Sequence, residues 1–300
     1  MEHHGLNLSR NPFVMGNESY EQALPKQQQP WPGYEKNMRP KVDHGERSYM
    51  GGAKLVGLKA LITGGDSGIG RAVAIAFARE GADVAITYYE EKDDAMETVG
   101  WIQEAGQTGR AIQADLRDQQ ECEAVADRAY HELNGLNILV NNAAIHIEKQ
   151  KLGEVSPEQL ERTFKTNFFS FFWVTQTALK YMHSGDVIIN TGSASGFRGH
   201  KTLTDYAATK AAIHNFTKSL AMQLAPRGIR VNCVSPGPVW TPLIPATREP
   251  EQVSSFGENT LWGRPAQPSE IAPSFVFLAS TDARFYTSEI LSPSGSVLNL

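Results

Sequence analysis

Short apolar runs alternate with helical patterns along most of this chain. The first run, Ala60-Leu61-Ile62, predicts a buried strand that leads through a glycine-rich turn into a helix over 69–80. Later runs predict further strands, with helical segments between them. This alternation favours an α/β fold, a doubly wound Rossmann-type parallel sheet of about seven strands with helices on both faces. The expected strands cover residues 60–62, 83–87, 111–112, 138–140, 187–189, 231–234 and 290–291.

Two segments between these strands carry signals of their own. Residues 156–159 read Ser-Pro-Glu-Gln, a capping box with proline at the first helical position, so we expect a helix to begin there. The apolar stretch over 164–182 is too long and too mixed for a strand. Residues 236–268 contain several prolines and little periodicity. Because long irregular loops in α/β domains are usually functional, we expect a substrate lid there.

The first 50 residues differ from the rest in composition. They contain several prolines, a glutamine run at 27–29 and scattered charge without periodicity, so they cannot bury enough apolar area for a core of their own. We expect residues 1–50 to form an extended arm, either disordered or laid over the catalytic domain or a neighbouring subunit. Trp31, Tyr34 and Met38 are its candidate anchors. Residues 51–300 then form a single Rossmann-type catalytic domain.

Charge and composition exclude several classes of protein. A formal net charge of -5 gives no basic field for nucleic acid or an anionic membrane. We find no apolar run of about 18 residues and no secretory signal, so we expect no membrane span and a cytoplasmic location. Cys122 and Cys233 are too few for a disulfide framework and too far apart for a metal-ligand pair. We therefore expect two inert thiols and no metal site.

The first chemical signal is the glycine-rich turn after the first predicted strand. Glycines let the backbone turn tightly and approach a pyrophosphate, whose charge then meets the free amides at a helix N-terminus. A glycine-rich turn alone is weak evidence, but here it lies between a strand and a helix, as dinucleotide binding requires. The candidate cofactor-binding residues of this turn are Gly64, Asp66, Ser67, Gly68, Ile69 and Gly70.

The second signal is a set of three polar side chains later in the chain. Tyr206 and Lys210 are four residues apart, so in a helix the phenol and the ammonium share a face. A nearby cation lowers a tyrosine pKa from its usual value of about 10, which suits proton transfer. Ser193 follows the strand over 187–189, at the sheet edge where ligands bind. Each residue alone would more often be structural, and the three gain weight only together.

In this order and spacing, these signals resemble the short-chain dehydrogenase/reductase family over about residues 54–291. The resemblance extends to Asp115-Leu116 after the third strand, Asn141-Asn142-Ala143-Ala144 after the fourth, Asn167 in the long helix, and residues 235–239 after the sixth. The arm and the turn together look like a subgroup described as glucose/ribitol-dehydrogenase-like or aldehyde-reductase-like.

The resemblance implies an NAD(P)-dependent oxidoreductase that transfers a hydride between nicotinamide and a carbonyl or alcohol. By that resemblance Tyr206 exchanges a proton with the substrate oxygen, and Ser193 holds the same oxygen. Lys210 binds the nicotinamide ribose and depresses the Tyr206 pKa, and Asn167 bends its helix and helps to hold a relay water. The further cofactor-binding residues it implies are Tyr88, Asp115, Leu116, Asn141, Ala143, Pro236, Gly237, Val239 and Thr241.

Two positions depart from the family pattern. Gly192 stands beside Ser193 where many relatives have paired serines, and the catalytic position itself is kept. Near the C-terminus, residues 292–296 replace a common glycine pair. That second departure puts a pocket wall and the usual subunit contacts in doubt.

The choice between NAD and NADP depends on the end of the second strand. An acid there would accept the ribose hydroxyls and repel a 2′-phosphate, but the position is Tyr88. Lys92 is the only cation nearby in sequence, and Glu90 and Glu91 follow Tyr88 directly. We expect NADP or NAD, with a slight preference for NADP.

The substrate is less defined than the chemistry. Ser193, Ser195, His146 and Trp240 are the candidate substrate contacts, and they suit a small polar carbonyl, a sugar-like polyol or a cyclic ketone about equally. A non-redox lyase, isomerase or dehydratase that uses Tyr206 as acid/base stays open, as does a cofactor-sensing protein, although the intact tetrad argues against the latter. The resemblance also implies a homotetramer built on the helices that carry Asn167 and Tyr206.

Overall fold

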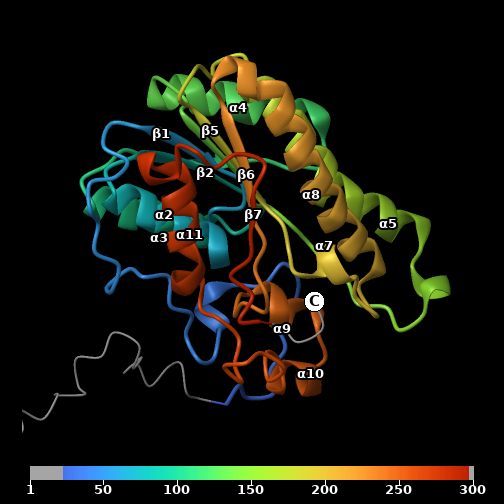
Figure 1. Cartoon of the computed structure of the whole chain (residues 1–300). Helices are drawn as coiled ribbons and strands as arrows, with labels where there is room; N and C mark the ends of the chain where they lie inside the picture. Colours follow the sequence, from blue (N-terminus) through green and yellow to red (C-terminus); the bar gives the residue numbers. More distant parts are fainter. Residues whose placement is uncertain (1–22, 297–300) are drawn as a thin grey trace, which may run out of the picture.

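A seven-stranded parallel sheet forms the centre of the molecule in the computed structural model, which describes residues 23–296 (Figure 1). The strand order is β3-β2-β1-β4-β5-β6-β7, and every pairing is parallel. The predicted α/β fold is therefore confirmed, and each predicted strand lies within or on the one observed. The strands are β1 (Lys59–Ile62), β2 (Asp83–Tyr88), β3 (Gly109–Gln113), β4 (Ile138–Asn141), β5 (Val187–Thr191), β6 (Arg230–Val234) and β7 (Ile290–Leu291).

The strand order reverses beside β1, and this reversal creates the ligand-binding edge. Ala60 of β1 pairs with Val84 of β2 on one side and with Ile138 of β4 on the other. The chain therefore leaves β1 toward one half of the sheet and β4 toward the other half. A crevice opens between the diverging loops at the carboxyl ends of such strands.

Helices cover both faces of the sheet (Figure 1). The layer of α2, α3 and α11 shares one hydrophobic cluster with the sheet, and the layer of α4, α6 and α8 shares another. None of the helices in residues 23–296 has the length and apolar character needed to cross a bilayer. The bounds are α2 (Gly68–Arg79), α3 (Lys92–Glu104), α4 (Gln119–Leu133), α5 (Pro157–Phe164), α6 (Ser170–Ala178), α7 (Ser195–Arg198), α8 (Thr204–Leu224) and α11 (Pro268–Ala279).

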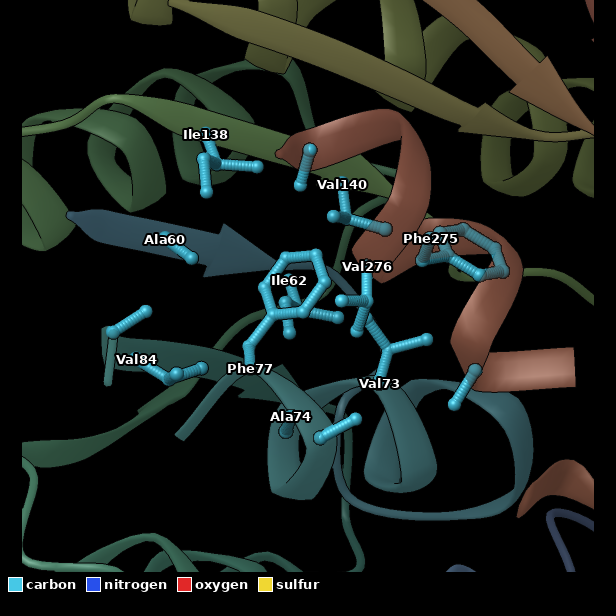
Figure 2. Packing of buried hydrophobic residues seen from close by; sticks show 14 of the residues in the cluster. Ala60, Ile62, Val73, Ala74, Phe77, Val84, Ile138, Val140, Phe275 and Val276 are labelled. Atoms are coloured by element: carbon cyan, nitrogen blue, oxygen red, sulfur yellow. The ribbon is translucent and has the colours of Figure 1, made fainter. Parts of the chain in front are cut away.

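Large apolar side chains fill the space between the sheet and its first helical layer. Figure 2 shows Phe77 of α2 and Phe275 of α11 beside Ile62 of β1 and Val140 of β4. All four side chains are fully buried. Burial of an apolar side chain of this size contributes about 1.5–3 kcal/mol. This packing fixes the start of α2 relative to β1, and with it the glycine-rich turn.

The long helix expected over 164–182 is interrupted. The Ser156 Oγ accepts a hydrogen bond from the Gln159 backbone N–H at 3.2 Å, so the predicted cap at the start of α5 is confirmed. Between α5 and α6 the chain forms a π-helical turn over Lys165–Phe169. Such turns inside helices often occur at functional sites, and this one contains Asn167.

The described part of the arm lies on the catalytic domain and contacts the segment after β6. Met38 is fully buried in a cluster with Val42, Trp240, Ile244 and Val253. The expectation of an irregular lid needs correction, because residues 236–268 contain the short helices α9 (Leu243–Thr247) and α10 (Pro250–Ser254). The arm itself forms a 3-10 turn, η2 (Glu35–Asn37), and residues 1–22 of the predicted arm lie outside the described residues. Figure 1 shows α9 and α10 beside the blue arm, beyond the carboxyl ends of the strands.

Candidate active site

A cavity of about 330 Å³ lies at the carboxyl ends of the strands, within the range of small-molecule sites. It brings together loops that follow β1, β2, β3, β4, β5 and β6. The sequence-predicted residues that line it are Gly64, Asp66, Ser67, Gly68, Ile69, Tyr88, Asp115, Leu116, Ala143, His146, Ser193, Ser195, Tyr206, Lys210, Pro236, Gly237, Val239 and Thr241.

The glycine-rich turn forms one wall, and its glycines are needed for close backbone packing. Gly64 has a φ of +62°, and a Cβ there would lie 3.0 Å from the Cα of Ala143. Gly70 does not line the cavity; a Cβ there would lie 1.9 Å from the Gly64 carbonyl oxygen. We therefore assign Gly70 to packing of the helix against the turn and correct its predicted role in cofactor contact. Asn142, which the prediction passed over, lines the cavity and donates its side-chain amide to the Gly64 carbonyl at 3.0 Å.

Two buried acids line the cavity beside Tyr88. Burial, and then the nearby charge of Glu91, raises the pKa of Asp66 to about 7. The pKa of Glu91 is also raised, first by its own burial. Although β2 ends in Tyr88 and not in an aspartate, two acids, Asp66 and Glu91, line this part of the cavity. At neutral pH they carry less negative charge than two exposed carboxylates would.

Ser193, Tyr206 and Lys210 meet at the other end of the cavity. Ser193 follows β5, and Tyr206 lies in the first turn of α8; both line the cavity, and the Ser193 hydroxyl lies near enough to the phenol to lower its pKa. The ammonium of Lys210, one turn further along, lies 5.5 Å from the centre of the Tyr206 ring. It donates to the backbone carbonyl of Thr191 at 2.8 Å. The structure thus places the hydroxyl, the phenol and the ammonium at one end of the same cavity, as the sequence predicted.

The protonation of this group differs from the expectation. Burial raises the pKa of Tyr206, although the nearby Ser193 hydroxyl and the charge of Arg248 oppose that rise. Burial also lowers the pKa of Lys210 to about 8. The predicted depression of the Tyr206 pKa by Lys210 is not found in the free protein, because the ammonium is directed to Thr191 and desolvation of the phenol dominates.

Asn167 lies behind the cavity wall and does not line it. Its side chain accepts from the Ile145 backbone N–H and donates to the Ile145 carbonyl, both at 2.8 Å. It also donates to Thr209 Oγ1 in α8 at 3.2 Å. The expected bend is present as the π-helical turn, and Asn167 links that turn to the loop after β4. We therefore describe it as a positioning residue.

The substrate end of the cavity is lined by polar groups. The ring of His146 lies 5.5 Å from that of Tyr206, and burial lowers the pKa of His146 to about 3, so it is neutral. Its Nδ1 lies 3.2 Å from Thr247 Oγ1 at the end of α9. Ser195 is buried, and its backbone N–H donates to Ser193 Oγ at 3.1 Å.

Arg248 is a cavity-lining residue that the sequence did not indicate. It follows α9 and forms an ion pair with Glu148 at 3.1 Å, in which the two side chains are only 15% and 9% exposed. Within the described residues, Arg248 Nε and Glu148 Oε2 are buried without a hydrogen-bond partner. Unpaired buried polar atoms are costly, so a polar ligand that satisfied them would be favoured.

Two predicted contacts lie away from the cavity. Asn141 ends β4 with its side chain directed into the protein, where its amide donates to Asn190 Oδ1 and Thr175 Oγ1, both at 3.0 Å. Trp240 is fully buried and donates from Nε1 to the carbonyl of Pro40 at 3.0 Å. The predictions of cofactor contact for Asn141 and substrate contact for Trp240 are corrected: Asn141 joins strands to a helix, and Trp240 anchors the arm.

Comparison with known proteins supports an enzyme of one large family. A family model described as enoyl-(acyl carrier protein) reductase matches residues 64–295. The chain is 43% identical to glucose and ribitol dehydrogenase from Daucus carota, covering 92% of this chain and 97% of that relative. It is 44% identical to NADPH-dependent aldehyde reductase 1, chloroplastic, from Arabidopsis thaliana, covering 89% and 95%. Both matches extend into the arm, because residues 51–300 make up only five sixths of the chain.

A solved structure with a similar fold covers most of this chain. The fold is similar to that of a short-chain dehydrogenase from Burkholderia cenocepacia J2315, which was crystallised in complex with NADP. The TM-score is 0.77 at 33% identity, and the alignment covers 81% of this chain and 99% of that chain.

Proposed function

Because the chain belongs to the short-chain dehydrogenase/reductase family, we propose that it transfers a hydride between a nicotinamide dinucleotide and a carbonyl or alcohol, with Tyr206 as the proton-transferring residue. The observation that carries this proposal is that Ser193, Tyr206 and Lys210 line one end of the cavity, with the Lys210 ammonium 5.5 Å from the centre of the Tyr206 ring. The relatives are named as dehydrogenases and reductases, which favours redox chemistry over a lyase, isomerase or dehydratase.

The residues of this chain divide the chemistry between them. A dinucleotide bound along the cavity would supply or accept the hydride at its nicotinamide ring. In carbonyl reduction, the Tyr206 hydroxyl gives its proton to the substrate oxygen, and Ser193 hydrogen-bonds the same oxygen. The phenolate left on Tyr206 is stabilised by the nearby Lys210 ammonium. In alcohol oxidation the proton moves the other way.

The glycine-rich turn and the cavity beyond it fit a dinucleotide. Gly64 allows a close backbone approach, and Ser67, Gly68 and Ile69 at the start of α2 line the cavity. The Gly68 backbone N–H already donates to Glu35 Oε1 at 2.7 Å, so the other groups of the turn would meet the pyrophosphate. We favour NADP slightly over NAD, because Arg162 lines the cavity and supplies a cation that sequence proximity did not reveal; the charge of Arg117, which also lines the cavity, is paired with that of Asp115. Two relatives support this choice, since one is named NADPH-dependent and the other binds NADP.

A small, polar, uncharged substrate suits the other end best. His146 is neutral, and the charge of Arg248 is balanced by Glu148. The arrangement therefore offers hydrogen bonds without a strong net charge. Such a site favours hydroxylated carbonyls or polyols over keto acids, and one relative is named for glucose and ribitol. Ser195 and His146 are the substrate contacts that we retain from the sequence.

We also propose the homotetramer that the family resemblance implies. Large apolar side chains are exposed on α5, α6, α8 and the π-helical turn, the elements expected at subunit contacts. Phe169 and Phe172 belong to a group of neighbouring rings with Phe168 and Phe216. Exposed apolar patches mark interfaces, and light scattering tests the assembly. The exposed side chains are Leu160, Phe169, Phe172 and Met222.

The cytoplasmic location stays a prediction.

The test of the proposed function is a panel of aldehydes, ketones and polyols assayed with NADPH, NADH and their oxidised forms. We expect turnover with at least one hydroxylated aldehyde or polyol, measured by the change in absorbance of the reduced nicotinamide. Dinucleotide binding without turnover on the whole panel would contradict the proposal and favour a cofactor-sensing or non-redox role.

A further inference from the structure

The arm supplies part of the cavity wall. Trp31 and Pro32 line the cavity together with Tyr89, which follows β2, and Arg117, which follows β3. In the sheet, β2 and β3 lie on the opposite side of β1 from β5, the strand that precedes Ser193. Trp31 therefore lies at the end of the cavity remote from the catalytic group. In the proposed function, which this inference deepens, that end holds the adenosine half of the dinucleotide.

Trp31 connects the two sides of this end. Its ring centre lies 5.6 Å from that of Tyr89, and the guanidinium of Arg162 in α5 lies 4.3 Å from the Trp31 ring centre. Arg117 fixes Tyr89 in turn, through a hydrogen bond of 2.9 Å to the phenol oxygen. The Arg162 Nε is buried and has no partner among residues 23–296. This end thus combines two aromatic rings, the Arg162 guanidinium with its unpaired Nε, and the Arg117 guanidinium, which is paired with Asp115.

A second contact joins the arm to the glycine-rich turn itself. Glu35 Oε1 accepts from the backbone N–H of Gly68 at 2.7 Å and lies 2.9 Å from His44 Nε2. Glu35 and His44 are both buried. Gln29 extends the docking to the lid, because its backbone N–H donates to the Pro245 carbonyl at 3.0 Å. The arm is therefore bonded to the turn on one side of the cavity and to α9 on the other.

The chemistry of this end matches an adenine nucleotide. Aromatic rings stack on nucleobases, and arginine pairs with both aromatic rings and phosphates. We propose that the arm is a structural wall of the dinucleotide site, in which Trp31, held by Arg162, closes the adenosine end, so that arm docking and dinucleotide binding stabilise each other. Reciprocity of this kind is a thermodynamic requirement wherever two events are coupled.

The test uses the full chain and measures binding rather than turnover. Trp31→Ala and the control Trp262→Ala are compared by calorimetric titration with adenosine 2′,5′-bisphosphate, which carries only the adenosine half. Trp262 is 76% exposed and does not line the cavity. Because stacking of one base on an aromatic ring is a substantial contact, we expect the Kd of Trp31→Ala to rise by about tenfold or more. Trp31→Phe should recover most of the loss, and Trp262→Ala should bind like the wild type.

Limited proteolysis supplies the reciprocal measurement. We expect NADPH to slow cleavage within residues 23–50 of the wild type and to protect Trp31→Ala much less. A Kd for Trp31→Ala within twofold of the wild type would overturn the inference, as would an equal loss in Trp262→Ala. If the wild type bound no dinucleotide, the proposed function itself would fail. If it bound and turned over while Trp31→Ala bound equally well, only the role of the arm would fail.

Discussion

Burial sets the protonation of the groups around the substrate. It raises the pKa of Tyr206, lowers that of Lys210 to about 8 and lowers that of His146 to about 3. At neutral pH the free protein therefore presents a protonated phenol, a mostly protonated ammonium and a neutral imidazole. In the proposed function this protonation state suits carbonyl reduction, because the Tyr206 phenol already holds the proton that it would donate.

We expect Asp66 to make the choice between NADP and NAD depend on pH. With its pKa raised to about 7, Asp66 is largely neutral at pH 6 and ionised at pH 8.5. Ionisation places a negative charge at the end of the cavity where a 2′-phosphate would bind. We expect the affinity for NADP relative to NAD to fall by about three- to tenfold across this range, as repulsion at intermediate distance predicts.

Binding titrations at both pH values test this effect in the wild type and in Asp66→Asn. The asparagine variant carries no titrating charge at this position, so its affinity ratio should change less than that of the wild type; the remaining change comes from Glu91 and from the 2′-phosphate itself, whose second pKa is near 6. If the affinity ratio of NADP to NAD changed equally with pH in the two proteins, Asp66 would not contribute to the choice of cofactor.

The sequence indicated some side-chain placements and not others. Tyr206 and Lys210 could be paired because a helix brings positions i and i+4 to one face. Asn141 could not be placed, because adjacent residues at a strand end point in opposite directions and the exact end was not known. Arg248 and Trp31 come from segments without periodicity, so nothing local indicated where their side chains would lie.

At the scale of elements, the turn after β5 has no room for the serine that many relatives carry beside the catalytic one. A Cβ on Gly192 would lie 2.6 Å from His214 Nε2 in α8 and 2.8 Å from Cys233 Sγ in β6. His214 is itself fixed by Ser235 Oγ at 2.8 Å. The departure from the family pattern at Gly192 thus has a packing reason, which is the side chain of His214.

Gly192→Ser should therefore destabilise the protein by about 1–3 kcal/mol, as overpacking does elsewhere. Chemical denaturation measures the change in the free energy of unfolding. Gly153→Ser is the matched control, because a Cβ at Gly153 would meet nothing within 4 Å; we expect it to change stability by less than about 0.5 kcal/mol. Equal stability of the two variants would show that the turn can move away from His214.

The elements themselves were predictable where periodicity was clear. Strong apolar runs located every strand, and the capping box at Ser156 located the start of α5. The π-helical turn at Asn167 was not visible, because its local sequence is as helical as its neighbours and the bend depends on bonds to Ile145. The helices α9 and α10 were missed because they are short and proline-rich.

In the complete fold, the arm and residues 236–268 complete the cavity wall that begins at the sheet. Trp240 of the lid segment bonds Pro40 of the arm, and both segments contribute to one small hydrophobic cluster. The C-terminal segment that replaces the family glycine pair also packs here, because a Cβ on Gly237 would lie 2.3 Å from the Ser294 carbonyl oxygen. The sequence could predict the sheet from local patterns, but the hydrogen bond between Trp240 and Pro40 joins residues 200 positions apart along the chain.

In the proposed reaction, the Tyr206 hydroxyl transfers the proton beside a bound dinucleotide. The most direct measurement of this transfer is single-turnover reduction of a substrate from the active panel by wild type and Tyr206→Phe, with the Kd of the reduced cofactor measured in parallel. We expect Tyr206→Phe to lose roughly 10²–10⁴-fold in rate while its cofactor Kd stays within about threefold of the wild type. A Tyr206→Phe enzyme that reduces the substrate at a rate within a few-fold of the wild type would contradict the account.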